Sequence, residues 1–225
     1  MRLASYPMRP PSHLIFTGGE WCSSEVIQTL LSHRPTVIAC DGSLTNCLDR
    51  DIVPDVVIGD MDSVGPDVLE RFVSLGGKVH LRKEQESHDL SKALVFAEEL
   101  GCTSCVVVGA TGGDREHEWA NLLSCASSSL EIECPGEDHA YRFLLPGSDH
   151  SIEMELGQTF SLFAVPIAED ITLTGAQYAL EKETLNMGSR GLHNVAAQPT
   201  VKVSYAKGRL MLLMHHPSTR VEGRP

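Results

Sequence analysis

The hydrophobic pattern of this chain changes near residues 135–148, and this change is the strongest constraint on its fold. Before it, short runs rich in β-branched residues alternate with longer amphipathic runs. After it, every run has the character of a strand, and no amphipathic run of helix length intervenes. Strand–helix alternation is typical of a parallel sheet covered by helices, whereas successive short strands form antiparallel sandwiches or barrels. The sequence therefore predicts two domains of different class.

The first domain, residues 1–140, is expected to be an α/β domain with a mostly parallel sheet and helices on both faces. The apolar runs predict strands at residues 13–17, 36–40, 56–58, 78–81 and 105–108. The amphipathic runs predict helices at residues 23–33, 66–75, 89–100 and 116–126. Pro66 suits the first turn of its helix, and Gly101 suits a helix end.

The second domain, residues 141–225, is expected to be an antiparallel β-sandwich. Its strand signals lie at residues 141–145, 151–156, 159–165, 171–180 and 200–214. Glycine-containing breaks separate several of them, at residues 146–147, 156–157 and 207–208.

The 225-residue chain has a formal net charge of −12. Because nucleic-acid binding calls for patches of Lys and Arg, nucleic acid is not an expected partner. An acidic protein agrees better with a site for cations, whether metal ions or a positively charged substrate. The N-terminus does not resemble a signal peptide, and no run approaches the roughly 18 apolar residues of a membrane span. We therefore expect no membrane partner.

Seven cysteines without a secretory signal indicate reduced thiols and hence a cytoplasmic protein. Cys102 and Cys105 have C-x-x-C spacing, but no second pair or histidine cluster follows at the spacing of zinc ligands. The expected role of this pair is therefore that of small buried side chains.

Acidic or glycine-rich turns follow three of the predicted strands. Asp41 follows the second strand, Asp60 and Asp62 follow the third, and residues 109–113 (GATGG) follow the fifth. In an open α/β sheet, ligands bind beyond the carboxyl ends of the strands. Mg²⁺ prefers oxygen ligands and commonly takes one or two carboxylates plus substrate phosphates. A glycine-rich turn lets backbone N–H groups approach phosphate oxygens.

Each of these features also has an ordinary interpretation. A lone D-x-D segment is usually a solvated loop, a lone glycine-rich turn is often only a tight turn, and Asp89 would suit a helix N-cap. The argument for a site comes from their combination, because chance loops would seldom place all of them at one edge of one sheet.

These segments resemble the thiamine pyrophosphokinase family in order and spacing. Residues 54–63 read PDVVIGDMDS, like the family pattern P-D-x-x-x-G-D-x-D-S. Residues 85–89 (QESHD) stand where the family has Q-D-x-T-D, and residues 109–121 resemble G-A-x-G-G-R-x-D-H-x-x-A-N. Residues 174–194 resemble the C-terminal thiamine-site segment. There are departures: Asp114 replaces an arginine, and His88 and His193 replace hydroxyl residues.

The resemblance implies transfer of pyrophosphate from ATP to the hydroxyethyl group of thiamine, with release of AMP. It implies that Mg²⁺ is held on the triphosphate by Asp60, Asp62 and Asp89, with Gln85 and His88 near the reacting phosphates. The nucleotide site would include Gly19, Asp41, Gly109, Gly112, Gly113 and His117. The thiamine site would include Tyr178, Ser189, His193 and Asn194. The resemblance also implies a homodimer in which two subunits share the thiamine site.

Two other functions remain open. One is a pyrophosphokinase that acts on another small alcohol, such as a hydroxymethylpterin, although the match at residues 188–194 argues against it. The other is a non-catalytic sensor of thiamine or nucleotide, which the substitutions at Asp114, His88 and His193 would suit.

Overall fold

The computed structural model describes residues 10–84 and 86–216, so the predicted site residue Gln85 lies outside the described residues. The chain divides into two compact units, Pro10–Gly136 and a unit that begins at Glu137. The division falls close to the change of hydrophobic pattern.

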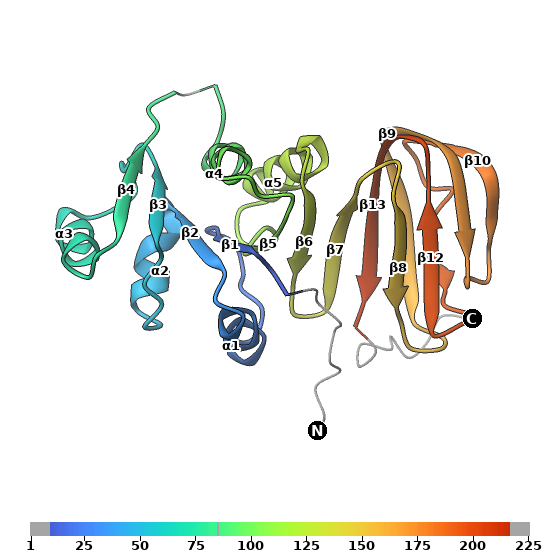
Figure 1. Ribbon diagram of the computed structural model, residues 1–225, viewed down its shortest axis with the longest axis horizontal. Coiled ribbons are helices and arrows are strands. Elements are labelled where there is room, and N and C mark those ends of the chain that lie inside the picture. The colour runs from blue at the N-terminus through green and yellow to red at the C-terminus, as the bar shows by residue number, and fades with distance from the viewer. Residues whose placement is uncertain (1–9, 85, 217–225) are drawn as a thin grey trace. The chain divides into compact units, whose positions relative to one another are not determined.

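The first unit is an α/β unit with a parallel sheet (Figure 1). Its strands are β1 (His13–Phe16), β2 (Thr36–Cys40), β3 (Val56–Gly59), β4 (Lys78–Leu81), β5 (Ser104–Val108) and β6 (Glu131–Pro135). Its helices are α1 (Ser24–Ser32), the 3₁₀ turn η1 (Asp41–Ser43), α2 (Leu44–Leu48), α3 (Pro66–Ser74), α4 (Asp89–Glu99) and α5 (Arg115–Ser127). The strands lie in the order β4-β3-β2-β1-β5-β6, and their recorded pairings are parallel.

The strand order contains a reversal that decides where a ligand would bind. From β1 the chain steps outward through β2 and β3 to β4, then crosses back to β5 on the other side of β1. Because such crossovers are right-handed, the first three helices cover one face and the last two cover the other. Figure 1 shows α4 and α5 on the opposite side of the strands from α1 and α2. The carboxyl ends of β1 and β5 therefore flank a topological switch point, where open α/β sheets bind ligands.

The central strands of this sheet are buried on both faces, which explains their continuous apolar sequences. Every residue of β3 is buried, whereas β4 at the edge of the unit is mostly exposed. The sequence interpretation missed η1, α2 and β6. Helix α2 has only five residues, too few to show a helical period.

The second unit is built from antiparallel strand pairs. Its strands are β7 (His139–Leu144), β8 (Asp149–Glu153), β9 (Thr159–Thr174), β10 (Leu180–Asn186), β11 (Asn194–Val195), β12 (Thr200–Ser204) and β13 (Lys207–His215). The main order is β7-β13-β9-β12-β8, and β10 and β11 also pair with β9. The whole chain thus combines parallel strands with helices and then antiparallel strands.

Strand β9 organises this unit. It is a single strand of 16 residues where the sequence predicts two strands, because Pro166 and the polar residues 169–170 interrupt the apolar pattern. Its first part pairs with β13, and its second part pairs with β10 and β12. Phe160, Leu162 and Leu173 of β9 are buried in a common core with residues of β7, β8, β12 and β13.

Candidate active site

Asp41 is the most deeply buried acid of the predicted site, with 1% of its surface exposed. It directly follows β2, in the 3₁₀ turn. One carboxylate oxygen accepts a hydrogen bond from the Gly42 N–H, and the other accepts one from the Met61 N–H at 3.1 Å. A Cβ on Gly59 would lie 2.7 Å from the Asp41 carboxyl carbon, so glycine is needed at the end of β3. Asp41 therefore joins the turns that follow β2 and β3.

Asp60 and Asp62 lie in the turn after β3. The Asp62 N–H donates a hydrogen bond to Oδ1 of Asp60 at 3.0 Å, while Met61 between them has a positive φ of 67°. Asp60 is half-buried and Asp62 is exposed. The turn thus holds one carboxylate by a backbone hydrogen bond and leaves the other open to solvent.

Asp89 begins α4, and Lys92 lies one turn along that helix. Nζ of Lys92 donates to Oδ1 of Asp89 at 3.2 Å. Lys92 is only 6% exposed, which is unusual for a lysine and calls for a charged partner. The sequence interpretation did not assign Lys92 to the site. The available signal was a charged residue on the apolar side of α4, beside the buried Leu90 and Ala93.

The acids influence one another electrostatically. Burial, followed by a hydrogen bond with the Asp89 carboxyl and its charge, raises the pKa of Asp41 to about 7, and the charge of Asp60 adds to the effect. Asp41, Asp60 and Asp89 therefore lie in one neighbourhood. Within residues 10–84 and 86–216, no three His, Cys, Asp or Glu residues are grouped closely enough to hold a metal ion by themselves. Phosphate oxygens of a substrate would have to complete such a site.

The turns after β1 and β5 are joined through their backbones at the switch point. The Gly19 N–H donates to the Gly109 carbonyl at 3.0 Å, and the Glu20 N–H donates to the Thr111 carbonyl at 2.8 Å. A Cβ on Gly19 would lie 2.3 Å from the Gly109 carbonyl oxygen. The hydroxyl of Thr17 also donates to that oxygen, at 2.8 Å. The predicted residues Gly19 and Gly109 thus form a tightly fitted pair of turns.

The glycine-rich turn continues into α5. Gly112 and Gly113 both have positive φ values, and the Gly112 N–H donates to the Glu118 carboxylate at 3.0 Å. Asp114, which departs from the family pattern, is the N-cap of α5, where its carboxylate accepts hydrogen bonds from the N–H groups of Glu116 and His117. These bonds lower the pKa of Asp114. Asp114, which stands where the family pattern has arginine, therefore caps α5.

His88 is directed toward α5. Its Nε2 lies 2.7 Å from the Ser124 hydroxyl and 3.2 Å from the Ala120 carbonyl oxygen. Burial lowers the pKa of His88, which favours neutral imidazole. Although His88 directly precedes Asp89, its Nε2 contacts α5, at Ser124 and at the Ala120 carbonyl oxygen. The side chain of His117 is exposed.

The predicted thiamine segment lies in the second unit. Tyr178 is 61% exposed, whereas Asn194 is 6% exposed. The Asn194 side chain both accepts a hydrogen bond from the Tyr178 backbone and donates one to it. The Tyr178 N–H donates to Oδ1 of Asn194 at 3.0 Å, and Nδ2 of Asn194 donates to the Tyr178 carbonyl at 2.8 Å. Oδ1 also accepts from the Val195 N–H. Asn194 therefore positions the Tyr178 segment.

The loop that contains the other predicted thiamine residues packs on β9. Gly191 lies so close to Leu162 that a Cβ would meet the Leu162 carbonyl oxygen, and His193, with a positive φ of 58°, donates its N–H to the Ser161 hydroxyl. The side chains of Ser189 and His193 are exposed. This loop and Tyr178 thus present an accessible surface.

The comparisons with known proteins agree on one family. Residues 27–134 match the family described as thiamin pyrophosphokinase, catalytic domain, and residues 149–210 match the one described as thiamin pyrophosphokinase, vitamin B1 binding domain. The two matched segments together take in most of the chain. The chain belongs to the thiamine pyrophosphokinase family.

Individual relatives support this assignment. Thiamine pyrophosphokinase 1 of Oryza sativa subsp. japonica is 28% identical over 166 residues, which cover 67% of this chain and 62% of that protein. Thiamine pyrophosphokinase 2 of the same plant is 31% identical over 151 residues, covering 61% of this chain and 56% of that protein. The chain thus spans about three fifths of the length of these relatives.

A solved structure shares the fold. The crystal structure of thiamine pyrophosphokinase from Bacillus subtilis matches with a TM-score of 0.76 and 23% identity, covering 91% of this chain and 99% of that chain. Among residues 10–84 and 86–216, no helix is long and apolar enough to cross a membrane.

Proposed function

We propose that the chain transfers the pyrophosphoryl group of ATP to the hydroxyl group of thiamine, giving thiamine diphosphate and AMP. The observation that carries this proposal is the gathering of Asp41, Asp60 and Asp89 at one edge of the parallel sheet, in a chain of the thiamine pyrophosphokinase family. The names of the plant relatives support thiamine as the acceptor.

The acids fit Mg²⁺ as the metal of the reaction. Their donor atoms are carboxylate oxygens, which Mg²⁺ prefers. Asp41 is hydrogen-bonded to the Asp89 carboxyl and lies within reach of the charge of Asp60. Asp60, Asp62 and Asp89 would hold the ion, which would neutralise charge on the triphosphate. Asp41 would support them by fixing the turn at Met61 through its hydrogen bond.

The other residues of the α/β unit would position the nucleotide. The joined turns at Gly19 and Gly109 bring backbone close to the switch point, and Lys92 adds a buried positive charge beside Asp89. Phosphoryl transfer depends mainly on positioning and charge stabilisation, so these contacts are the expected contribution of the protein. This gives residues 1–140 the role of an ATP- and metal-binding domain.

The second unit, residues 141–225, would bind thiamine. The exposed ring of Tyr178 suits stacking on a cationic heterocycle, and Ser189, His193 and Asn194 would offer hydrogen bonds. We further propose that its strands pack as a sandwich and that two copies of the chain share the thiamine site. A cytoplasmic location would suit its seven free cysteines.

The proposal is tested by incubating the purified chain with ATP, Mg²⁺ and thiamine and measuring AMP and thiamine diphosphate. Equal amounts of both products are expected, with none when chelator removes Mg²⁺. Thiamine binding without either product would instead identify a sensor. Turnover with a hydroxymethylpterin but not with thiamine would reassign the acceptor.

A further inference from the structure

Helices α4 and α5 are joined by hydrogen bonds beside Asp89, one of the acids proposed to hold Mg²⁺. Nε2 of His88 lies 2.7 Å from the Ser124 hydroxyl oxygen, and the Ser91 hydroxyl oxygen also lies 2.7 Å from that atom. His88 directly precedes Asp89, and Ser91 follows two residues after it. One hydroxyl group of α5 therefore holds the first turn of α4 at two points around Asp89.

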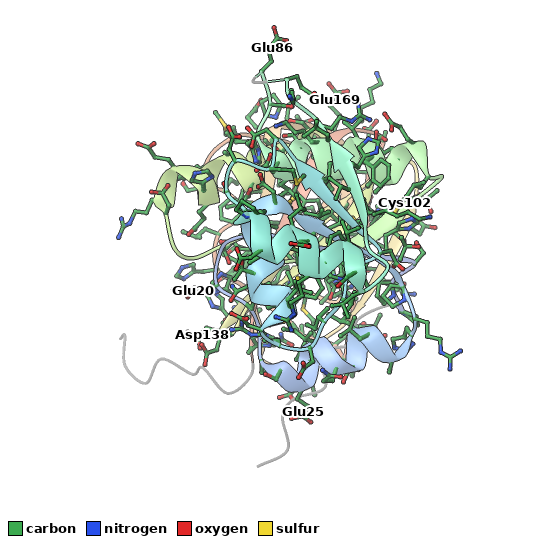
Figure 2. The ribbon with its side chains drawn as sticks, turned by 90° about the vertical axis from the view of Figure 1, so that its left-hand side faces the viewer. Glu20, Glu25, Glu86, Cys102, Asp138 and Glu169 are labelled. Carbon is green, nitrogen blue, oxygen red and sulfur yellow. The ribbon has the colours of Figure 1, made fainter. Side chains whose placement is uncertain are left out.

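The side chain of His88 serves this contact and not the cap of its own helix. His88 is the N-cap residue of α4, yet its side chain makes no capping hydrogen bond. Its Nε2 also lies 3.2 Å from the Ala120 carbonyl oxygen, which can only accept, so that bond requires a hydrogen on Nε2. Figure 2 shows Glu86 projecting outward from the segment that leads into α4. The segment thus becomes attached to α5 only at His88, immediately before Asp89.

Helix α5 is itself fixed to the glycine-rich turn that precedes it. Nδ2 of Asn121, which is 6% exposed, donates to the Ala110 carbonyl oxygen at 3.0 Å. The Gly112 N–H donates to the Glu118 carboxylate of the same helix. The turn proposed to approach the nucleotide and the helix that bears Ser124 are therefore held together, and the contact with α4 extends this connection to Asp89.

A groove of about 510 Å³ separates α4 and α5 along most of their length. It leaves Val95 of α4 and Leu123 of α5 exposed, so apolar packing between the helices is limited there. At the far end of the groove, Oε1 of Glu98 accepts hydrogen bonds from the Ser128 and Ser129 hydroxyls and from the Ser129 N–H. Polar contacts at its two ends therefore join this side of α4 to α5.

The other side of α4 is held by apolar packing. Leu90, Ala93 and Ala97 are buried where the helix packs on β2 and β3. Apolar burial is not directional, whereas hydrogen bonds depend on distance and angle. The hydrogen bonds at Ser124 are thus the contacts that restrict the rotation of the first turn and the direction of the Asp89 carboxylate.

We propose that His88, Ser91 and Ser124 are positioning residues that fix Asp89 for a metal-bound triphosphate. This assignment rests on the proposed function, because it takes Asp89 as a ligand of Mg²⁺. Groups that hold a ligating side chain in place raise metal affinity, since less freedom is lost when the ion binds. His88, which stands where the family pattern has a hydroxyl residue, acts through Ser124 of α5 and does not touch phosphate.

The first test measures binding by calorimetry, with Mn²⁺ and a non-hydrolysable ATP analogue as the probe. Mn²⁺ accepts the same carboxylate ligands as Mg²⁺. Ser124→Ala removes the shared hydroxyl and leaves a strong helix former, so the chain should still fold. Its affinity for the probe should fall roughly 2- to 12-fold, as expected for a lost hydrogen bond.

Glu98→Ala is the matched control, because it removes the hydrogen bonds between α4 and the end of α5 that lie far from Asp89. Its affinity for the probe should stay within about twofold of that of the wild type. An equal loss in Glu98→Ala and Ser124→Ala would overturn the assignment, since general loosening of α4 would then explain both.

A double-mutant cycle separates positioning from direct contact with phosphate. If His88 acts through Ser124, the variant with both His88→Ala and Ser124→Ala should bind the probe no more weakly than His88→Ala alone. His88→Gln, which retains an N–H donor, should bind it more tightly than His88→Ala. Additive losses in the double variant, or wild-type affinity in Ser124→Ala, would overturn the assignment.

Hydrogen exchange without ligand measures the positioning itself. The Lys92 N–H donates to the His88 carbonyl at 3.2 Å, so its exchange reports on the first turn of α4. It should exchange faster in Ser124→Ala but not in Glu98→Ala, and unchanged exchange in Ser124→Ala would contradict the assignment. If the wild type did not bind the probe at all, the proposed function would fail, and the assignment with it. If the wild type and Ser124→Ala bound it equally well, only the assignment would fail.

Discussion

At the scale of single residues, the side chains of Asp60 and Asp62 differ in hydrogen bonding and in exposure. Asp60 accepts a hydrogen bond from the Asp62 backbone, whereas the Asp62 carboxylate is exposed. Asp62→Asn keeps that backbone donor, so folding should be unchanged, but an amide is a much poorer Mg²⁺ ligand. We expect turnover to fall by at least about a hundredfold. The measurement is AMP release at millimolar Mg²⁺, together with thermal unfolding.

Asp67→Asn provides the matched control, because it removes an exposed carboxylate from the first turn of the next helix. Its rate should stay near that of the wild type. Retained activity in Asp62→Asn would refute the metal assignment.

Variants of Asn194 and Tyr178 would distinguish the positioning of the thiamine site from direct contact with thiamine. Asn194→Ala removes the side chain that bonds to the Tyr178 backbone, which should lower the free energy of unfolding by about 1–3 kcal/mol. Asn194→Ala should also raise the KM for thiamine roughly 2- to 12-fold, because a positioned contact with thiamine is lost. The KM for ATP should change little. Tyr178→Ala should raise the same KM while leaving stability nearly unchanged, since Tyr178 is mostly exposed.

Steady-state kinetics with each substrate, combined with denaturant unfolding, would measure both effects. If either variant shifted the KM for ATP instead, the assignment of thiamine to this segment would fail.

At the scale of elements, the contact between the turns after β1 and β5 depends on the absence of a side chain at Gly19. Gly19→Ala would drive a methyl group into the Gly109 and Thr111 carbonyl oxygens, at 2.3 and 2.4 Å, and should destabilise the chain by about 1–3 kcal/mol. It should also weaken ATP binding. Gly18→Ala is the control, because its added methyl group meets nothing within 4 Å. Equal effects of the two substitutions, by calorimetry and unfolding, would argue against this fit.

The first turn of α5 should make stability depend on pH. The N–H groups of His117 and Glu116 donate hydrogen bonds to the Asp114 carboxylate and lower the pKa of Asp114. The ionised carboxylate therefore contributes fully to folding stability at pH values above the unfolded-state pKa of Asp114. That contribution is lost as pH falls through the folded-state pKa. Asp114→Ala should therefore lower the melting temperature near neutral pH, and the difference should shrink in acid. Asparagine can still cap the helix, so Asp114→Asn should lower the melting temperature less than Asp114→Ala does near neutral pH. If the decrease in melting temperature of Asp114→Ala did not depend on pH, the capping explanation would be contradicted.

At the scale of the whole molecule, the proposed shared site predicts complementation between subunits. If one copy supplies the acids and the other supplies Tyr178, mixing inactive Asp62→Asn chains with Tyr178→Ala chains creates one intact site per mixed dimer. The assay uses a thiamine concentration far below the raised KM of Tyr178→Ala, at which that variant alone shows almost no turnover. After random exchange, about one quarter of wild-type activity is expected, since half of the dimers are mixed and half of their sites are intact. Sedimentation would confirm the dimer, and no recovery in a verified mixed dimer would show that each site lies within one chain.

The sequence by itself determined the two kinds of unit and predicted acids at the ends of neighbouring strands. Strand–helix alternation and strand-only patterning are local periodicities, so they are visible without tertiary contacts. Asp41, Asp60 and Asp62 could be predicted as neighbours because the carboxyl ends of parallel strands share an edge. The 16-residue strand β9 could not be predicted as a single strand, because its apolar pattern is interrupted. Its continuity depends on pairing with neighbouring strands.

Only the tertiary structure decided what several side chains contact. Asp41 reaches the Met61 N–H, Asn194 reaches the Tyr178 backbone, and His88 bonds to Ser124 of α5, each across a long stretch of sequence. Lys92 likewise became visible only when its burial was known. The physical reason is that residue type and spacing specify the face on which a side chain lies, whereas its hydrogen-bond partner depends on which distant elements pack against that face.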